Sequence, residues 1–152
     1  MNKLAKQAMV FAAMASAVSG VALANDNDHD RKACSDATLH GTYGIQFQGT
    51  RFAPPPIGQT EAVIGVVIRH YDGDGKVTQV DNVKGEKSGY VPDRFGSGTY
   101  HVNDDCSVVV DFQPAPGIFI QERLVIVDKG HELRGISILP PTLMVTSTQL
   151  KM

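Results

Sequence analysis

Apolar and polar residues alternate along most of the chain after residue 40, in short runs separated by Gly, Pro, Asn and Asp. In residues 41–47 the alternation places Tyr43, Ile45 and Phe47 on one face, which is typical of a half-buried strand. Seven further runs are rich in β-branched or alternating residues. The expected strands occupy residues 41–47, 60–71, 76–83, 99–103, 107–112, 118–128, 132–139 and 142–150.

This spacing of short strands predicts an all-β domain. No stretch after residue 24 shows a sustained apolar period of 3.6 residues, so no long amphipathic helix is expected. We expect a small antiparallel meander barrel of about eight strands. A β-sandwich is the alternative, because strand number and spacing alone do not separate the two architectures.

The segments between the strands carry recognisable turn chemistry. Residues 53–58 contain three consecutive prolines, which lack N–H donors, so they predict a stiff loop. The sequence Asp-Gly-Asp-Gly at 72–75 is typical of a hairpin turn. Gly65 interrupts a long β-branched run and suggests a bend or bulge. Residues 84–98 are expected to form a loop with one short edge segment.

The first 24 residues have the three parts of a secretory signal peptide. Lys3 and Lys6 precede an apolar run at 8–18, and residues 22–24 read Ala-Leu-Ala, which predicts cleavage after Ala24. A transmembrane anchor is the alternative. The apolar stretch is short for a span and is rich in Ala, Ser and Gly, so the signal peptide is preferred.

Cleavage would leave a polar, flexible leader at 25–33 and a single barrel domain at 34–152. No second long apolar stretch follows, so no membrane span is expected in the mature chain, which would be periplasmic or extracellular. The formal net charge of the whole chain is −2, and its basic residues are scattered. Nucleic acid is therefore not an expected partner, because phosphate binding requires clustered positive charge.

The two cysteines, Cys34 and Cys106, are expected to form a disulfide, because exported proteins fold in an oxidising compartment. The bond would close a loop of about 70 residues and stabilise the fold by on the order of 4 kcal/mol. A reactive Cys106 with His101 as its base is the alternative. Residues five apart on a strand point to opposite faces, which argues against it. Neither cysteine belongs to a zinc-binding pattern.

Other candidates for chemistry are weak. Asp72, Asp74 and Asp81 resemble part of a calcium loop, but Lys76 and Val83 stand where an EF-hand needs ligands. Adjacent carboxylates at 104–105 would point in opposite directions, and a metal site between His70 and His101 has no supporting pattern. We expect no cofactor, no metal and no catalytic residue, and whether the protein is an enzyme stays open.

Three segments carry a resemblance to a known group of proteins. The chain reads CSDATLHGTYGIQFQG from residue 34, YDGDGKV from 71 and GSGTYHVNDDCSV from 96. Over residues 34–107 it resembles small exported bacterial proteins of unknown function, with a departure at Ser107-Val108, where Thr-Gly would be expected. The resemblance implies a small antiparallel barrel similar to calycins or to allene oxide cyclase-like barrels. It implies no established activity.

Three functions follow from such a barrel. The first is the binding of a small, largely apolar ligand, because barrels of about eight strands can enclose one. Its lining would come from Tyr43, Phe47, Tyr100 and Phe112, although these aromatic rings could equally fill the barrel. The second is a structural or interaction domain without a pocket, in which the prolines at 54–56, 114 and 116 would protect sheet edges. The third is a cyclase or isomerase acting on a lipid-derived substrate, which a buried ionisable group in a cavity would favour.

Overall fold

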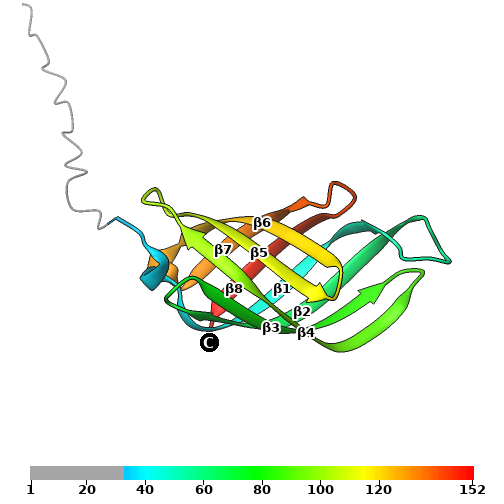
Figure 1. The fold of residues 1–152 in the computed structure, drawn as a ribbon, viewed down its shortest axis with the longest axis horizontal. Coiled ribbons are helices and arrows are strands. Elements are labelled where there is room, and N and C mark those ends of the chain that lie inside the picture. The colour runs from blue at the N-terminus through cyan, green and yellow to red at the C-terminus, as the bar shows by residue number, and fades with distance from the viewer. Residues whose placement is uncertain (1–32) are drawn as a thin grey trace, which may run out of the picture. The chain divides into compact units, whose positions relative to one another are not determined.

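The computed structural model describes residues 33–152. The predicted signal peptide at 1–24, and all of the predicted leader except residue 33, lie outside the described residues. Figure 1 shows that strands dominate the fold. Within residues 33–152 two short 3₁₀ helices accompany them. The strands are β1 (His40–Phe52), β2 (Thr60–Asp72), β3 (Lys76–Gly85), β4 (Gly89–Val102), β5 (Ser107–Ala115), β6 (Ile118–Val127), β7 (Glu132–Leu139) and β8 (Met144–Lys151).

The eight strands form a closed antiparallel barrel in sequence order. Each strand pairs with the next, and β1 also pairs with β8, with Tyr43 opposite Lys151. The predicted all-β meander barrel is therefore confirmed, and the sandwich is excluded. A closed barrel has no free sheet edge. The prolines at 54–56 and 116 lie in connections between strands and Pro114 lies near the end of β5, so their protective role at sheet edges stays a prediction.

β4 corrects the loop expected at 84–98. Gly89–Val102 is one continuous strand, and a bulge between the Asp81 and Val83 pairings admits its proline. Asp81 pairs with Arg94 and Val83 pairs with Val91, so Asn82 faces two residues of β4. The bulge interrupts the β3–β4 hydrogen-bond ladder at this point. Pro92 has no N–H group to donate, so it fits in the strand where no carbonyl of β3 requires a donor.

Gly65 does not form the expected bulge. The register of β2 runs without a shift past Gly65 in its pairings with both β1 and β3. Gly65 lies opposite Phe47, and a Cβ at this position would be only 2.3 Å from Phe47 Cζ. The glycine is required for the close approach of an aromatic ring rather than for a bulge.

Three tyrosines fill one end of the barrel, which is called the closed end below. The ring of Tyr71 makes edge-to-face contacts with Tyr43 and with Tyr100, at centroid distances of 5.3 and 5.0 Å. The hydroxyl of Tyr43 donates to the carbonyl of Gly130 at 2.6 Å, and that of Tyr100 donates to the carbonyl of Leu39 at 2.9 Å. The aromatic rings are thus tied to the segments that cover this end.

Aliphatic side chains, together with the ring of Phe112, complete the core around the tyrosines. The other buried members are Leu39, Val77, Val102, Val108, Val110, Phe112, Leu124 and Leu133. Helix η2 (Asp36–Thr38) lies at this end, and the connections between β1 and β2 and between β3 and β4 lie at the opposite end (Figure 1). The second 3₁₀ helix, η3 (Asp128–Gly130), also contributes to the closed end through Gly130.

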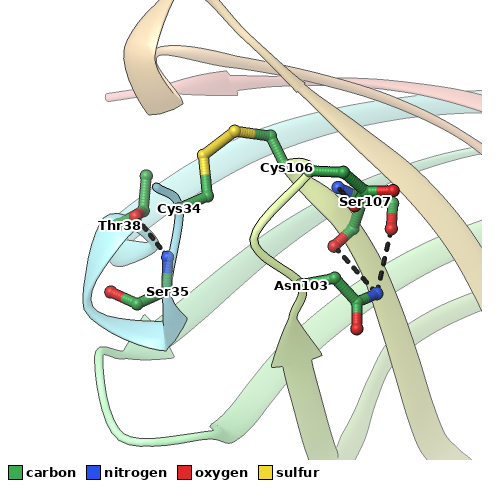
Figure 2. The surroundings of a disulfide bond; sticks show 7 residues. Cys34, Ser35, Thr38, Asn103, Cys106 and Ser107 are labelled. Carbon is green, nitrogen blue, oxygen red and sulfur yellow. Dashed lines mark hydrogen bonds between the residues drawn. A yellow bond between two sulfur atoms is a disulfide. The ribbon is translucent and has the colours of Figure 1, made fainter. Parts of the chain in front are cut away.

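The disulfide between Cys34 and Cys106 is present, and no described cysteine is free. It joins the segment before η2 to the turn between β4 and β5, over a sequence separation of 72 residues (Figure 2). Cys106 adopts a left-handed conformation with φ 66°. Asn103 Nδ2 donates to Ser107 Oγ at 2.9 Å across the same turn. Cys106 therefore fastens the closed end, and it has no thiol to act as a nucleophile.

The turn at 72–75 uses its first aspartate as an internal acceptor. Asp72 Oδ1 accepts hydrogen bonds from the N–H groups of Asp74 and Lys76, at 2.7 and 2.9 Å, which lowers the Asp72 pKa. Within residues 33–152 there is no group of three or more His, Cys, Asp or Glu side chains placed to hold a metal. In the same part of the chain no helix has the length and apolar character needed to cross a membrane.

Candidate functional site: the cavity at the open end of the barrel

The barrel interior is hollow at the end opposite the tyrosines, which is called the open end below. A cavity of about 330 Å³ lies there, and all eight strands contribute side chains to its wall. The inward positions of the alternating strands supply these side chains. The apolar part of the wall includes Ile45, Phe47, Val63, Val67, Phe112 and Ile120.

The four aromatic residues predicted to line a ligand site divide between the two ends. Phe47 and Phe112 are part of the cavity wall. Tyr43 and Tyr100 do not line the cavity, because both are buried in the closed-end core and their hydroxyls bond to backbone groups. Burial, together with the neighbouring hydroxyls of Tyr71 and Tyr100, raises the pKa of Tyr43 to about 12. Both tyrosines end a Gly-Thr-Tyr sequence, at 41–43 and 98–100, and both contribute to the core.

An ion pair crosses the barrel at the inner end of the cavity. Arg69 of β2 is only 2% exposed, and its Nη1 donates to Glu122 Oε2 of β6 at 2.7 Å. The same nitrogen donates to the hydroxyl of Tyr71 at 3.3 Å, which places the pair directly above the closed-end core. Burial opposes the charge on Arg69, but the Glu122 carboxylate outweighs it, so the pKa of Arg69 is raised.

Aromatic and amide groups complete the surroundings of the Arg69 guanidinium. Its Cζ lies 4.9 Å from the centre of the Phe112 ring. Tyr71 donates its hydroxyl hydrogen to Gln149 Oε1 at 2.9 Å. Gln149 is fully buried and its Nε2 has no hydrogen-bond partner among the described residues.

A chain of hydrogen bonds extends from Arg69 along the cavity wall. Gln79 Oε1 accepts from Arg69 Nε and Nη2 at 2.8 and 2.6 Å, and Gln79 Nε2 donates to Asp81 Oδ2 at 3.3 Å. Asp81 in turn accepts two bonds from Arg94, at 2.8 and 3.0 Å. Polar side chains of β2, β3, β4 and β6 therefore form one connected network against an otherwise apolar wall.

A third ion pair lies nearer the opening. Glu61 of β2 is buried and accepts from Arg51 Nε at 2.8 Å and from the hydroxyl of Ser88 at 2.6 Å. It also accepts from the backbone N–H groups of Lys87 and Ser88. The hydrogen bond from the Ser88 hydroxyl and those from Arg51 and the backbone lower the pKa of Glu61 to about 2 against the effect of burial.

Sequence reasoning missed these charged residues. On β2, Glu61 and Arg69 stand in phase with Val63, Val67 and Tyr71, which are the inward positions. A charged residue on the apolar face of an alternating strand is a signal that was available in the sequence. Their partners were not available, because Arg69 and Glu122 are 53 residues apart and only barrel closure brings them together.

A second depression, of about 790 Å³, lies on the outer surface over β1, β6, β7 and β8. Its lining includes outward-facing side chains such as Arg134, Ile136 and Thr146. It contains none of the three ion pairs described above. The interior cavity is therefore the better candidate, since it combines a mainly apolar wall inside the barrel with buried polar groups.

Comparison of the chain with protein-family models, with curated proteins and with solved structures gives no match. The resemblance to small exported proteins and to calycin-like barrels thus stays a prediction from the motifs.

Proposed function

We propose that the protein binds a small, largely apolar ligand in the cavity at the open end of the barrel. The observation that carries the proposal is the contrast between the two ends of one barrel. Bulky side chains fill the closed end, while the open end has a cavity of about 330 Å³. This volume is at the lower end of the range found for small-molecule sites.

The polar groups in the wall support a site that orients its ligand. The ion pairs of Arg69 with Glu122 and of Arg94 with Asp81 both border an apolar cavity. A few polar groups in a mainly apolar wall fix the orientation of a ligand, whereas a barrel that only needs filling is most stable with apolar side chains. The network is therefore better explained by binding than by stability.

Two adjacent residues of β2 provide a direct test. Val67 faces the cavity and is 6% exposed, while Val66 faces outward and is 58% exposed. Octanol serves as a probe for a small, largely apolar ligand. Val67→Phe should weaken its binding, measured by calorimetry, by roughly tenfold or more, because the added ring occupies the cavity. Val66→Phe is the matched control and should leave the affinity unchanged. Equal affinities for the two variants would contradict binding in this cavity.

The natural ligand can be sought without a guess at its identity. Native mass spectrometry of protein taken from its own host should show a bound small molecule, and Val67→Phe protein prepared in the same way should lack it. A clean apo mass for the unsubstituted protein, together with no octanol binding, would favour a structural domain instead.

A cyclase or isomerase is the second candidate function, because the cavity wall contains ionisable groups. The two carboxylates that line it, Asp81 and Glu122, are each bonded to a guanidinium. Neither stands apart as a lone acid or base, so we place binding first. Chemical conversion of a ligand identified by mass spectrometry, lost in Glu122→Gln, would reverse this order.

Export is part of the proposal. The disulfide supports it, since such bonds persist in oxidising compartments. Protein recovered from the envelope or the medium should begin at Asn25, as shown by N-terminal sequencing. Retention of Met1 in that fraction would contradict cleavage after Ala24.

A further inference from the structure

We infer that the ligand presents an uncharged hydrogen-bond donor, a hydroxyl group, to Glu122 at the inner end of the cavity. This inference rests on the proposed binding function and specifies the chemistry of the ligand. It follows from counting which donors and acceptors of the buried network are already used.

The guanidinium of Arg69 has no donor left for a ligand. Its five N–H groups are matched by five hydrogen bonds, which go to Gln79 twice, to Tyr71 once and to Glu122 twice. An anionic ligand therefore cannot use Arg69 as its counter-ion.

Glu122, by contrast, has hydrogen-bond acceptor positions that no described residue uses. A carboxylate offers about four lone-pair positions, and among residues 33–152 only Arg69 donates to Glu122, at 2.7 and 3.5 Å. The side chain lines the cavity and is 14% exposed. The inner end of the cavity thus offers unused acceptors and no unused guanidinium donor.

This asymmetry selects among ligand head groups. A ligand that inserts a methyl end would strip water from Glu122 without replacing its hydrogen bonds, which is unfavourable for a charged acceptor. An ammonium group would add a second cation beside Glu122, whose charge Arg69 already balances at 2.7 Å. A hydroxyl satisfies the acceptor and adds no charge.

The outer part of the cavity instead offers unused hydrogen-bond donors. Arg94 uses Nε and Nη2 on Asp81, and Arg51 uses Nε and Nη2 on Glu61 and Ser88. No described residue accepts a hydrogen bond from Nη1 of either arginine. A carboxylate-only ligand would be held here, with its apolar tail against Glu122, so octanoate is the natural competitor in the test.

Two isomeric probes isolate the donor. Octanol and heptyl methyl ether contain the same atoms, but only octanol has a hydrogen to donate. A featureless apolar cavity would prefer the ether, because the ether gives up less hydration on leaving water. We expect octanol to bind the unsubstituted protein more tightly than the ether by roughly tenfold, and more tightly than octanoate.

The double variant Arg69→Met with Glu122→Leu replaces the ion pair by apolar side chains of similar length, a change that buried pairs often tolerate. It should reverse the order, so that the ether binds better than octanol. The double variant Arg134→Met with Glu132→Leu removes an exposed ion pair on β7 and is the matched control, which should keep the octanol preference.

The outcomes separate the inference from the proposed function. If the ether or octanoate binds the unsubstituted protein as well as octanol does, the cavity binds ligands but the assignment of a hydroxyl at Glu122 is wrong. If none of the three probes binds, the binding function itself is contradicted. The comparison in the unsubstituted protein decides the matter even if the ion-pair variant does not fold.

Discussion

Gly65 and Phe47 face each other across the β1–β2 ladder, and the aromatic ring occupies the space where a Cβ on Gly65 would lie, 2.3 Å from Phe47 Cζ. Gly65→Ala should therefore displace the ring and lower the free energy of unfolding by about 1–3 kcal/mol, as overpacked sites do. Because Phe47 lines the cavity, octanol affinity should change as well. Urea unfolding and calorimetry measure the two effects.

A second glycine of the same sheet provides the control. A Cβ at Gly44 would meet only the side chain of Met152, at 3.8 Å, which is an ordinary contact. Gly44→Ala should change the free energy of unfolding by no more than about 0.5 kcal/mol. If Gly44→Ala and Gly65→Ala lower the free energy of unfolding by similar amounts, the effect comes from replacing a glycine in a strand and not from contact with the Phe47 ring.

Removal of the disulfide should weaken the fold and spare the cavity. The double variant Cys34→Ser with Cys106→Ser should lower the free energy of unfolding by roughly 2–5 kcal/mol, because the disulfide reduces the conformational entropy of the unfolded chain. The bond lies at the closed end, so octanol binding at low temperature should persist. Loss of binding in a variant that is still folded, seen by circular dichroism and calorimetry, would show coupling between the two ends.

Acid should destabilise the protein partly through Glu61. Its pKa is about 2 in the folded protein against an ordinary value of 4.5, so its stabilising effect is complete above pH 4.5 and is lost as the pH falls toward 2. Glu61→Gln should flatten the fall in the free energy of unfolding over this interval, measured by urea titration at several pH values. Ser88→Ala removes the hydrogen bond with the largest effect on Glu61 and should move the loss to higher pH. An unchanged slope in Glu61→Gln would contradict the assignment.

The hydroxyl of Tyr100 should matter more than that of an exposed tyrosine. It accepts from the N–H of Gly73 at 2.9 Å and donates to the carbonyl of Leu39, so Tyr100→Phe leaves buried backbone groups unpaired. We expect a loss of about 1–3 kcal/mol in thermal or urea unfolding. Tyr90, which is 61% exposed, is the control, and Tyr90→Phe should cost no more than about 0.5 kcal/mol.

The strand pattern was largely predictable because apolar and polar residues alternate along a strand that has one buried and one exposed face. Tyr43 and Ile45 were expected on the same, buried face of the first strand, and both are buried. β4 was the exception, since its first half carries Gly, Pro and Asp, which local propensity assigns to loops. Pairing with β3 and the bulge opposite Asn82 outweigh that propensity.

The cavity could not be predicted in the same way. Alternation says that a side chain points inward, but the tilt and register of eight strands decide which inward side chains meet. Tyr100 and Phe112 follow the same pattern and both belong to the buried core, yet only Phe112 also borders the cavity. The ion pair of Arg69 with Glu122 depends on contacts across the barrel, which no local pattern contains.

The ladder between β1 and β8 has a consequence for the order of folding. A ribosome delivers β1 first and β8 last, and the pairing of Tyr43 with Lys151 joins positions near the two ends of the described chain. One side of β1 therefore has no partner until β8 has been synthesised, and barrel closure follows the pairing of all the other strands. Loss of the last eight residues would leave two open strand edges that pair readily with other molecules, so truncation should yield aggregates rather than a smaller barrel.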